Sequence, residues 1–341
     1  MRPVTVLVTG AGSPGTAALL RALRENGERD VRLVGVDMSE RSVGRHLCDG
    51  FHVVVPSTDP SFARSLLEIV EADGVDVVLP QTSYDLPPLA AARDRFSVPV
   101  LVSSAETVRR SNDKAETYAL LRAGGITAPD FRRVRGGGAA VAAARELGYP
   151  ERDVAVKPVF SSGSRGFRVL SARADRREQL LTNRPGVAEA LRLEELVGLL
   201  GDDETELLVM ELAAGGERTI DGIADGRGIV LGHPKTREAM RAGLTMHFVT
   251  LADDALMELA ERIVAALEIE HFFNIQLVGE HVIEVNPRIS TIVYQEDLNL
   301  PYLGVKRALG EISDEALASY ASRIRPGRTA LRYFDQLEWD S

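Results

Sequence analysis

Three side chains with oxygen ligands fall on one face of a predicted β-hairpin in the last third of the chain. Gln276 lies in one apolar run, and Glu284 and Asn286 lie two residues apart in the next, hence on the same side of a strand. Carboxylate and carboxamide oxygens without His or Cys suit a hard cation such as Mg²⁺, which completes its shell with phosphates and water. Arg288, on the same face, could bind a phosphate through two guanidinium nitrogens. The spacing predicts a metal and phosphate site, with an ordinary polar strand face as the alternative.

This prediction depends on the turn that joins the two strands. If residues 279–281 form a three-residue loop, Gln276 lies directly opposite Glu284, with side-chain bases about 5 Å apart. A two-residue turn at 279–280 would shift the register by one residue and move Gln276 to the other face. The metal site therefore requires the three-residue loop.

The elements before residue 105 predict a parallel sheet. Buried-strand patterns alternate with helical periodicity, which is typical of a doubly wound α/β sheet. The strand patterns lie at 4–8, 31–36, 53–55, 75–79 and 98–102. Asp37 and the loop 80–85, with Asp85, lie where strands end, so a ligand at that edge should meet them.

The rest of the chain predicts an α+β arrangement. A helix is expected at 112–123 and another at 139–147, and the two-residue alternation at 153–157 marks a change to antiparallel sheet. Further strands are expected at 207–212, 219–224, 228–231, 273–278 and 282–285, with a helix at 253–267.

Composition excludes several classes of protein. With 341 residues and 45% apolar content, the chain can form two or three compact units. A net charge of -10 without a basic run argues against a nucleic-acid surface. The single cysteine, Cys48, cannot form an internal disulfide and is expected to be a buried small residue. With no apolar stretch of about 18 residues, we expect a cytoplasmic protein without a membrane partner.

The first strand is followed by a dinucleotide-type motif. Gly10-x-Gly12-x-x-Gly15, with Asp37 at the end of the next strand, satisfies the fingerprint of nicotinamide-binding proteins. Pro14 removes one amide donor from this loop, and a glycine-rich first turn serves any ligand at a helix N-terminus. A tight turn or a substrate-facing loop therefore remains beside the dehydrogenase hypothesis, which ranks last.

Several segments together resemble ATP-grasp enzymes, especially the large-subunit branch of carbamoyl-phosphate synthases. The sequence Asn274-Ile275-Gln276 followed by 283–288 resembles the metal-binding strands of that family. The segments 111–114, 153–158, 161–166, 209–212 and 215–217 resemble its other landmarks, in the same order. The resemblance implies a Rossmann-like pre-ATP-grasp domain (1–105), a two-lobed ATP-grasp domain with antiparallel sheets (106–310) and a C-terminal tail without an assigned role (311–341). The small lobe would span about 125–210, and the large lobe, with the metal site, about 211–310.

The resemblance implies ATP with Mg²⁺ or Mn²⁺ as cofactors and assigns a role to individual residues. Those expected to bind ATP are Lys114, Lys157, Ser161, Ser162, Gly163, Ser164, Gly166, Met210, Glu211, Leu212 and Glu217. The metal ligands would be Gln276, Glu284 and Asn286. The catalytic cations would be Lys235, Arg237 and Arg288, and the substrate contacts Asp37, Asp85, Asp221 and Thr291.

Lysine usage supports these assignments. Only four of the 40 basic residues are Lys, which leaves 36 Arg. Three of the four, Lys114, Lys157 and Lys235, coincide with the family's landmarks, where a compact ammonium fits between phosphate oxygens. The fourth, Lys306, is expected to be a surface charge.

The implied activity is that of a carboxylate–amine ligase. A small-molecule carboxylate, such as an amino acid, would attack the γ-phosphate of ATP, and an amine would displace phosphate from the acyl phosphate. His233 or His247 is a candidate for the amine proton, and a homodimer is one expected assembly. The alternatives are a carbamoyl- or carboxy-phosphate synthase and a non-catalytic ATP-binding module; the former normally needs two grasp units, and this chain has the length for one.

Overall fold

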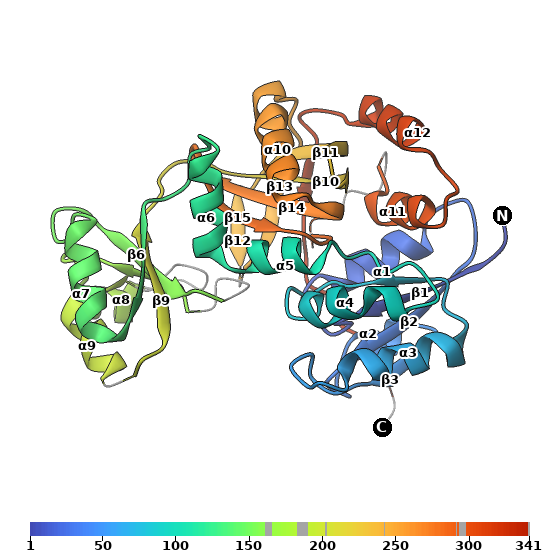
Figure 1. Ribbon diagram of the computed structural model, residues 1–341, viewed down its shortest axis with the longest axis horizontal. Helices are drawn as coiled ribbons and strands as arrows, with labels where there is room; N and C mark the ends of the chain where they lie inside the picture. Colours follow the sequence, from blue (N-terminus) through green and yellow to red (C-terminus); the bar gives the residue numbers. More distant parts are fainter. Residues whose placement is uncertain are drawn as a thin grey trace.

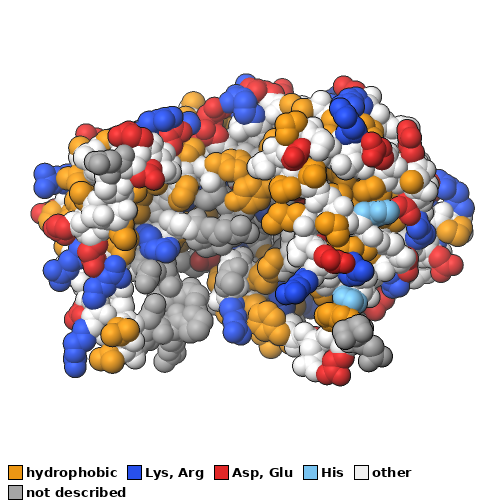
Figure 2. Space-filling view, turned by 90° about the horizontal axis from the view of Figure 1, so that it is seen from below, with side chains coloured by type: hydrophobic (Ala, Val, Ile, Leu, Met, Phe, Trp, Pro, Cys, Tyr) orange, Lys and Arg blue, Asp and Glu red, His pale blue; other side chains and the backbone are white. Residues whose placement is uncertain are grey.

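The computed structural model describes residues 1–160, 166–182, 190–201, 203–241, 243–290, 292 and 298–339. In Figure 1 the N-terminal sheet lies at the right, the lobe that contains α7 and α9 lies at the left, and the sheet with β14 and β15 lies between them. On the face shown in Figure 2, Lys and Arg side chains are interspersed with Asp and Glu. None of the described helices is long and apolar enough to span a membrane.

The N-terminal part is a Rossmann-like parallel sheet, as the sequence predicts. Its strands are β1 (Val4–Thr9), β2 (Val31–Asp37), β3 (Gly50–Val53) and β4 (Val77–Leu79), in the order β3-β2-β1-β4. The helices of this part are α1 (Thr16–Arg24), α2 (Gly44–Leu47), α3 (Phe62–Asp73) and α4 (Leu86–Ala92), followed by a 3-10 turn at Arg93–Arg95. Strand β1 is buried on both faces, which explains its continuous apolar sequence. The expected strand at 98–102 is reduced to a single bridge between Val78 and Val100.

The helix expected at 112–123 is present as α6, and a further helix, α5, precedes it. Helix α5 (Ala105–Asn112) ends before Asp113, and α6 (Lys114–Ala123) begins directly after it. The Asp113 carboxylate accepts hydrogen bonds from the backbone N–H groups of Ala115 and Glu116, as a helix N-cap does. This cap fixes Lys114 as the first residue of α6.

The left-hand lobe is built on a five-stranded sheet in the order β5-β9-β6-β7-β8. Its strands are β5 (Phe131–Arg135), β6 (Val154–Pro158), β7 (Arg168–Leu170), β8 (Ala190–Leu191) and β9 (Glu206–Glu211). All pairs are antiparallel except β7 with β8. Helices α7 (Gly136–Glu146), α8 (Arg176–Thr182) and α9 (Leu193–Leu200) complete this lobe.

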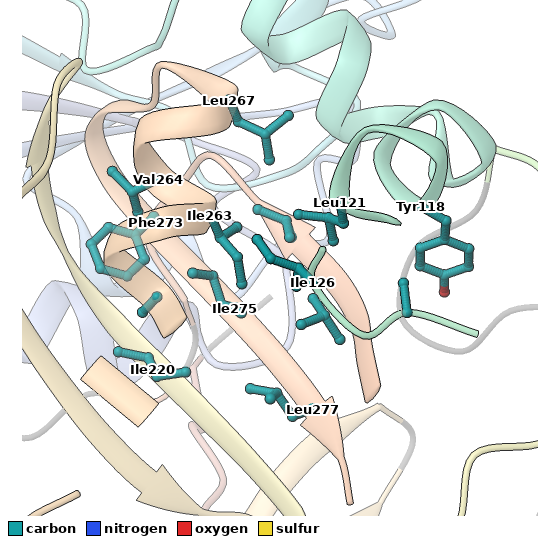
Figure 3. Packing of buried hydrophobic residues seen from close by; sticks show 14 of the residues in the cluster. Tyr118, Leu121, Ile126, Ile220, Ile263, Val264, Leu267, Phe273, Ile275 and Leu277 are labelled. Carbon is teal, nitrogen blue, oxygen red and sulfur yellow. The ribbon is translucent and has the colours of Figure 1, made fainter. Parts of the chain in front are cut away.

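The central lobe contains an antiparallel sheet in the order β11-β10-β14-β15. These strands are β10 (Glu217–Asp225), β11 (Ile229–Thr236), β14 (Glu270–Val278) and β15 (His281–Asn286). Phe273, Ile275 and Leu277 of β14 are buried in one apolar cluster with residues of α10 (Asp254–Leu267), shown in Figure 3. Because side chains alternate along a strand, Asn274 and Gln276 face the opposite side. The packing of α10 thus decides which face of the sheet is polar.

A third sheet and the C-terminal segments were not anticipated. Strands β12 (Ala239–Arg241), β13 (Leu244–Val249) and β16 (Thr329–Leu331) pair in the order β12-β13-β16. Helices α11 (Leu300–Ala308) and α12 (Asp314–Ala318) and a 3-10 turn at Ser319–Arg323 precede β16. Beyond β16 the Trp339 ring stacks on His46 of the N-terminal domain, with ring centroids 3.9 Å apart.

Two smaller expectations need correction. Lys306 is not a surface charge: it is 7% exposed, and its Nζ lies 2.6 Å from Glu28 Oε2. Cys48 is only partly buried.

Candidate nucleotide and metal site

The β14–β15 hairpin closes with a two-residue turn, Gly279–Glu280, so the expected three-residue loop is wrong. Gln276 nevertheless pairs with Glu284, because the register shifts between Gln276 and Leu277. Leu277 pairs with Val282, which leaves Ile283 as the extra residue of a β-bulge. The bulge offsets the short turn, and it also separates Val282, which is fully buried, from Glu284.

The turn requires its glycine. Gly279 has φ of 55°, and a Cβ at this position would lie 2.4 Å from the Ala214 carbonyl oxygen. Since a side chain would be both strained and in collision, the segment before β10 and the hairpin can approach this closely only at glycine.

Asn274 organises the polar face of the sheet. Its Oδ1 accepts hydrogen bonds from Gln276 Nε2 at 2.9 Å and from Asn286 Nδ2 at 3.3 Å. Its Nδ2 donates to Thr219 Oγ1 at 2.7 Å and to Asp221 Oδ1 at 2.8 Å. Sequence reasoning missed this residue as a site residue, although its place two residues before Gln276 on the same strand face was a usable signal.

The Gln276 side chain is held on its oxygen side by Arg237. Arg237 NH1 donates to Gln276 Oε1 at 2.6 Å and lies 3.3 Å from Glu217 Oε2, and its Nε donates to Thr245 Oγ1 at 3.0 Å. Burial lowers the pKa of the Arg237 guanidinium, and the charge of Glu217 opposes that shift. A metal ion could use the Gln276 oxygen only if Arg237 moved away.

Lys235 and Asp221 form a buried ion pair behind this face. Lys235 Nζ lies 2.9 Å from Asp221 Oδ2, and both side chains are 2% exposed or less. Each charge is compensated by the other, which fits a structural pair better than a free catalytic cation. Burial, together with the charge of Lys235, lowers the pKa of nearby His233 to about 2, so His233 is a poor acceptor for an amine proton.

The two phosphate-lysine candidates meet near Glu284. Lys114 Nζ lies 3.1 Å from Glu284 Oε1, and Lys157 Nζ donates to the Tyr118 hydroxyl at 3.3 Å. Burial lowers the pKa of Lys157 to about 7, and the charge of Lys114 adds to the decrease. Burial alone would raise the pKa of Glu284, but the charges of Lys114 and Lys157 outweigh it and lower this pKa, so Glu284 is a carboxylate.

A narrow cavity joins these groups to the N-terminal domain. It is lined by Ser83, Tyr84, Ser111, Asn112, Lys114, Phe160, Glu284 and Asn286. Arg288 Nε donates to Ser83 Oγ at 2.9 Å, and Asn112 Nδ2 donates to the Ser83 carbonyl at 3.1 Å. Burial lowers the pKa of the Arg288 guanidinium, although Glu284 opposes this shift. Ser83 and Asn112 are contacts that sequence reasoning did not assign.

The two acidic substrate candidates of the N-terminal domain are engaged internally. Asp37 accepts from the Gly12 N–H at 2.7 Å and from the Ser39 N–H at 2.9 Å. Asp85 is 7% exposed and accepts from Thr9 Oγ1 at 2.7 Å, and burial raises its pKa. The Gly12 amide, which would face a phosphate in a dinucleotide-binding loop, is therefore used by a carboxylate of the protein itself.

The remaining candidates are distributed as follows. Ser161, Ser162, Gly163, Ser164 and Thr291 lie outside the described residues. Gly166 has φ of 73°, and a Cβ there would lie 2.7 Å from Pro158 Cδ at the end of β6. Met210 and Glu211 end β9, Leu212 follows it, and Glu217 begins β10, so these four residues lie on the connection between the two lobes.

The residues fit a metal–nucleotide complex better than a bare metal ion. No cluster of three or more His, Cys, Asp or Glu side chains that could hold a metal occurs among the residues that the structure describes. Glu284 and Asn286 offer oxygens, yet Lys114, Lys157 and Arg288 surround Glu284 with positive charge. These positive charges repel a metal ion that arrives alone. They attract phosphate groups, which can bring a bound metal ion with them.

Comparisons with known proteins found one matching family model and a distant curated relative. Residues 203–328 match the family model described as ATP-grasp in the biosynthetic pathway with Ter operon. The carbamoyl phosphate synthase large chain of Pseudomonas syringae pv. tomato is 24% identical over 286 residues, which are 80% of this chain. This chain spans about a quarter, 24%, of the length of that relative.

Solved structures of low sequence identity share the fold over nearly the whole chain. The carboxyaminoimidazole ribonucleotide synthase of Aspergillus clavatus, complexed with ATP, has a TM-score of 0.67 at 17% identity and covers 92% of this chain and 79% of that one. The L-amino acid ligase of Bacillus licheniformis has a TM-score of 0.65 at 17% identity, with 96% and 79% covered. The biotin carboxylase of Campylobacter jejuni has a TM-score of 0.63 at 16% identity, with 95% and 74% covered.

The resemblance inferred from the sequence motifs is thereby confirmed, together with the fold class. The Rossmann-like parallel sheet and the antiparallel sheets belong to a fold that these structures share over nearly the whole chain. The chain has the ATP-grasp fold, and its residues 203–328 carry the sequence pattern of an ATP-grasp family.

Proposed function

We propose that the protein is an ATP-dependent carboxylate–amine ligase that forms an acyl phosphate and releases ADP and phosphate. The observation that carries this proposal is the convergence of Lys114, Lys157 and Arg288 on Glu284, beside Asn286. Buried cations around a carboxylate and a carboxamide suit the phosphates of a nucleotide and its metal ion. The names of two similar structures, an L-amino acid ligase and a carboxyaminoimidazole ribonucleotide synthase, support a bond-forming reaction.

Each group has a defined task in this proposal. Glu284 and Asn286 would hold Mg²⁺, which when bound neutralises phosphate oxygens, and Gln276 would join them only after Arg237 moves. Lys114, Lys157 and Arg288 would stabilise charge on the transferred phosphoryl group. Segment 161–166 would cover the phosphates. The nucleoside would be contacted by Met210, Glu211, Leu212 and Glu217. Asp221 and Lys235 would keep Asn274, and through it both amides, in place.

Substrate identity, assembly and location belong to the same proposal. We expect small-molecule substrates to bind beside Ser83 and Arg288, because the contact between these two residues joins the loop after β4 to the segment that follows β15. The proposed units are the pre-grasp domain to about residue 105, the grasp domain to about 310 and the tail. We further propose a cytoplasmic protein that acts as a homodimer.

A second candidate is a carbamoyl- or carboxy-phosphate synthase. The observation that favours it is the similarity to a carbamoyl phosphate synthase large chain. In that case bicarbonate would be the phosphoryl acceptor instead of an organic carboxylate.

ADP release in the presence of ATP and Mg²⁺ separates these activities. We would supply the protein with pairs of amino acids, with bicarbonate and with bicarbonate plus ammonia. Release that needs both an organic carboxylate and an amine supports the ligase, whereas release with bicarbonate supports the second candidate. Glu284→Ala should abolish release, and Glu280→Ala, at the exposed turn of the same hairpin, should not. ATP binding and turnover unaffected by Glu284→Ala would overturn the proposed site.

A further inference from the structure

The Tyr118 hydroxyl is a buried polar group in an apolar cluster. Tyr118 lies on α6 and is fully buried beside residues such as Leu121 and Ile126 (Figure 3). A phenylalanine would fill the same space, and a hydroxyl taken out of water costs free energy unless it is hydrogen-bonded. The hydroxyl therefore needs partners of its own.

Both partners belong to the candidate site. The Tyr118 hydroxyl donates to the Ile283 carbonyl oxygen at 2.6 Å and accepts from Lys157 Nζ at 3.3 Å. Ile283 is the extra residue of the bulge in β15, and such a residue is left out of the regular ladder of backbone hydrogen bonds. Tyr118 supplies a hydrogen-bond donor to the carbonyl of this residue.

The contact of Tyr118 with Ile283 lies next to the contact of Lys114 with Glu284. Lys114 and Tyr118 are four residues apart on α6, so their side chains lie on the same helix face. Lys114 reaches Glu284 and Tyr118 reaches the carbonyl of Ile283, so α6 holds two successive residues of β15. Through Lys157 the same hydroxyl also reaches β6 in the other lobe.

We propose that Tyr118 is a positioning residue for nucleotide binding: its hydroxyl fixes the Lys157 ammonium relative to the bulged strand that carries Glu284 and Asn286. Without this hydroxyl, Lys157 loses a hydrogen-bond acceptor and the Ile283 carbonyl loses a donor. The phosphate-binding cation and the metal-binding strand would then no longer be held to one another. This inference rests on the proposed nucleotide site and adds a residue to it.

A double-mutant cycle tests the proposal. The affinity for Mg²⁺-ADP would be measured by calorimetry for the wild type, Tyr118→Phe, Lys157→Met and the double variant. Hydrogen bonds to charged groups are stronger than those between neutral groups, so Tyr118→Phe should weaken binding roughly tenfold or more. If Tyr118 acts through Lys157, the same change should have little further effect in the Lys157→Met background.

Tyr149→Phe is the matched control. Tyr149 is 9% exposed, and its hydroxyl accepts from the Leu193 N–H at 3.4 Å in the left-hand lobe, within a different apolar cluster from that of Tyr118. The Tyr149→Phe variant should have lower thermal stability than the wild type but the same affinity for nucleotide. Tyr118→Met, which removes the hydroxyl but keeps a flexible apolar side chain, replaces Tyr118→Phe if that variant shows no cooperative thermal transition.

The outcomes are distinct. Wild-type affinity in Tyr118→Phe, or an equal loss in both backgrounds, would overturn the positioning role while leaving the proposed function intact. A wild type that binds no nucleotide would overturn the proposed function and this inference with it. A loss confined to the background that contains Lys157 supports the inference.

Discussion

The Arg237 guanidinium donates a 2.6 Å hydrogen bond to the side-chain oxygen of Gln276, a neutral member of the expected metal set. This contact makes Gln276 the weakest candidate ligand. We expect Gln276→Met to raise the Mg²⁺ concentration for half-maximal ADP release by no more than about tenfold, or ~1.4 kcal/mol. Glu284→Ala should abolish release under the same conditions. A loss as complete in Gln276→Met would instead mean that Arg237 withdraws and the oxygen binds the metal.

Lys157 should take up a proton when nucleotide binds. Its pKa of about 7 leaves the amine mostly neutral at pH 8, and the phosphates favour the ammonium. Affinity should therefore fall as pH rises above 7, with uptake of up to about one proton at pH 8. Calorimetry in buffers of different ionisation enthalpy measures this uptake. It should vanish in Lys157→Met and persist in Lys306→Met, whose lysine is paired with Glu28.

The Lys157 amine should also make the stability of the protein depend on pH. The pKa of Lys157 is lowered from 10.5 to about 7 by folding, so between these values the unfolded chain binds more protons. The contribution of Lys157 to the free energy of unfolding therefore rises with pH across that window. Urea unfolding of the wild type and Lys157→Met at pH 7 and pH 9 checks it: the difference between the two proteins should change with pH in this direction.

The Asp221–Lys235 pair should behave as a buried structural ion pair. Lys235→Met alone leaves a buried carboxylate unpaired, which should lower the free energy of unfolding by about 3–5 kcal/mol. Asp221→Leu combined with Lys235→Met should recover most of this loss, as measured by urea unfolding. Lys306→Met is the reference, because its Glu28 partner is 39% exposed and the loss should be about 1 kcal/mol or less. A single variant as stable as the wild type would contradict the structural role.

Alanine substitutions at two glycines should change the free energy of unfolding in opposite directions. A Cβ on Gly222 of β10 would lie 2.3 Å from the Leu231 carbonyl oxygen and 2.5 Å from the Phe273 ring. Gly222→Ala should therefore destabilise the protein by about 1–3 kcal/mol. Gly138 of α7 has open space around it, so Gly138→Ala should stabilise by about 0.4–1 kcal/mol. Thermal or urea unfolding distinguishes the two, and equal signs would contradict the assigned packing.

Elements whose periodicity reflects burial could be predicted from the sequence. The parallel sheet follows from apolar runs such as Val4–Thr9, and the polar face of β14 follows from the alternation of Asn274 and Gln276 with apolar residues. The break between α5 and α6 was also within reach, since Asp113 is a common type of N-cap. Strands β12 and β16 were missed because each has only three residues, and β13, with six, was missed because it mixes polar with apolar residues.

Contacts distant in sequence explain what could not be predicted at the site. Asp37 and Asp85 end or follow strands as expected, yet Gly12 and Thr9 engage them across the sheet edge. The Gln276–Glu284 pairing was expected for the wrong reason, because the spacing allows a longer turn as readily as a bulge. The bulge is seen in the strand register and in the contact of Tyr118 with Ile283, and those two residues are 165 positions apart.

The bulge at Ile283 also bears on how relatives of this protein can be recognised. A regular hairpin with the same two-residue turn would place the equivalents of Gln276 and Glu284 opposite each other with one residue fewer between them. The same arrangement of ligands is therefore compatible with two different intervals along a chain. Search patterns that fix the interval would divide one group of enzymes into two, whereas patterns that allow a one-residue gap at Ile283 would keep them together.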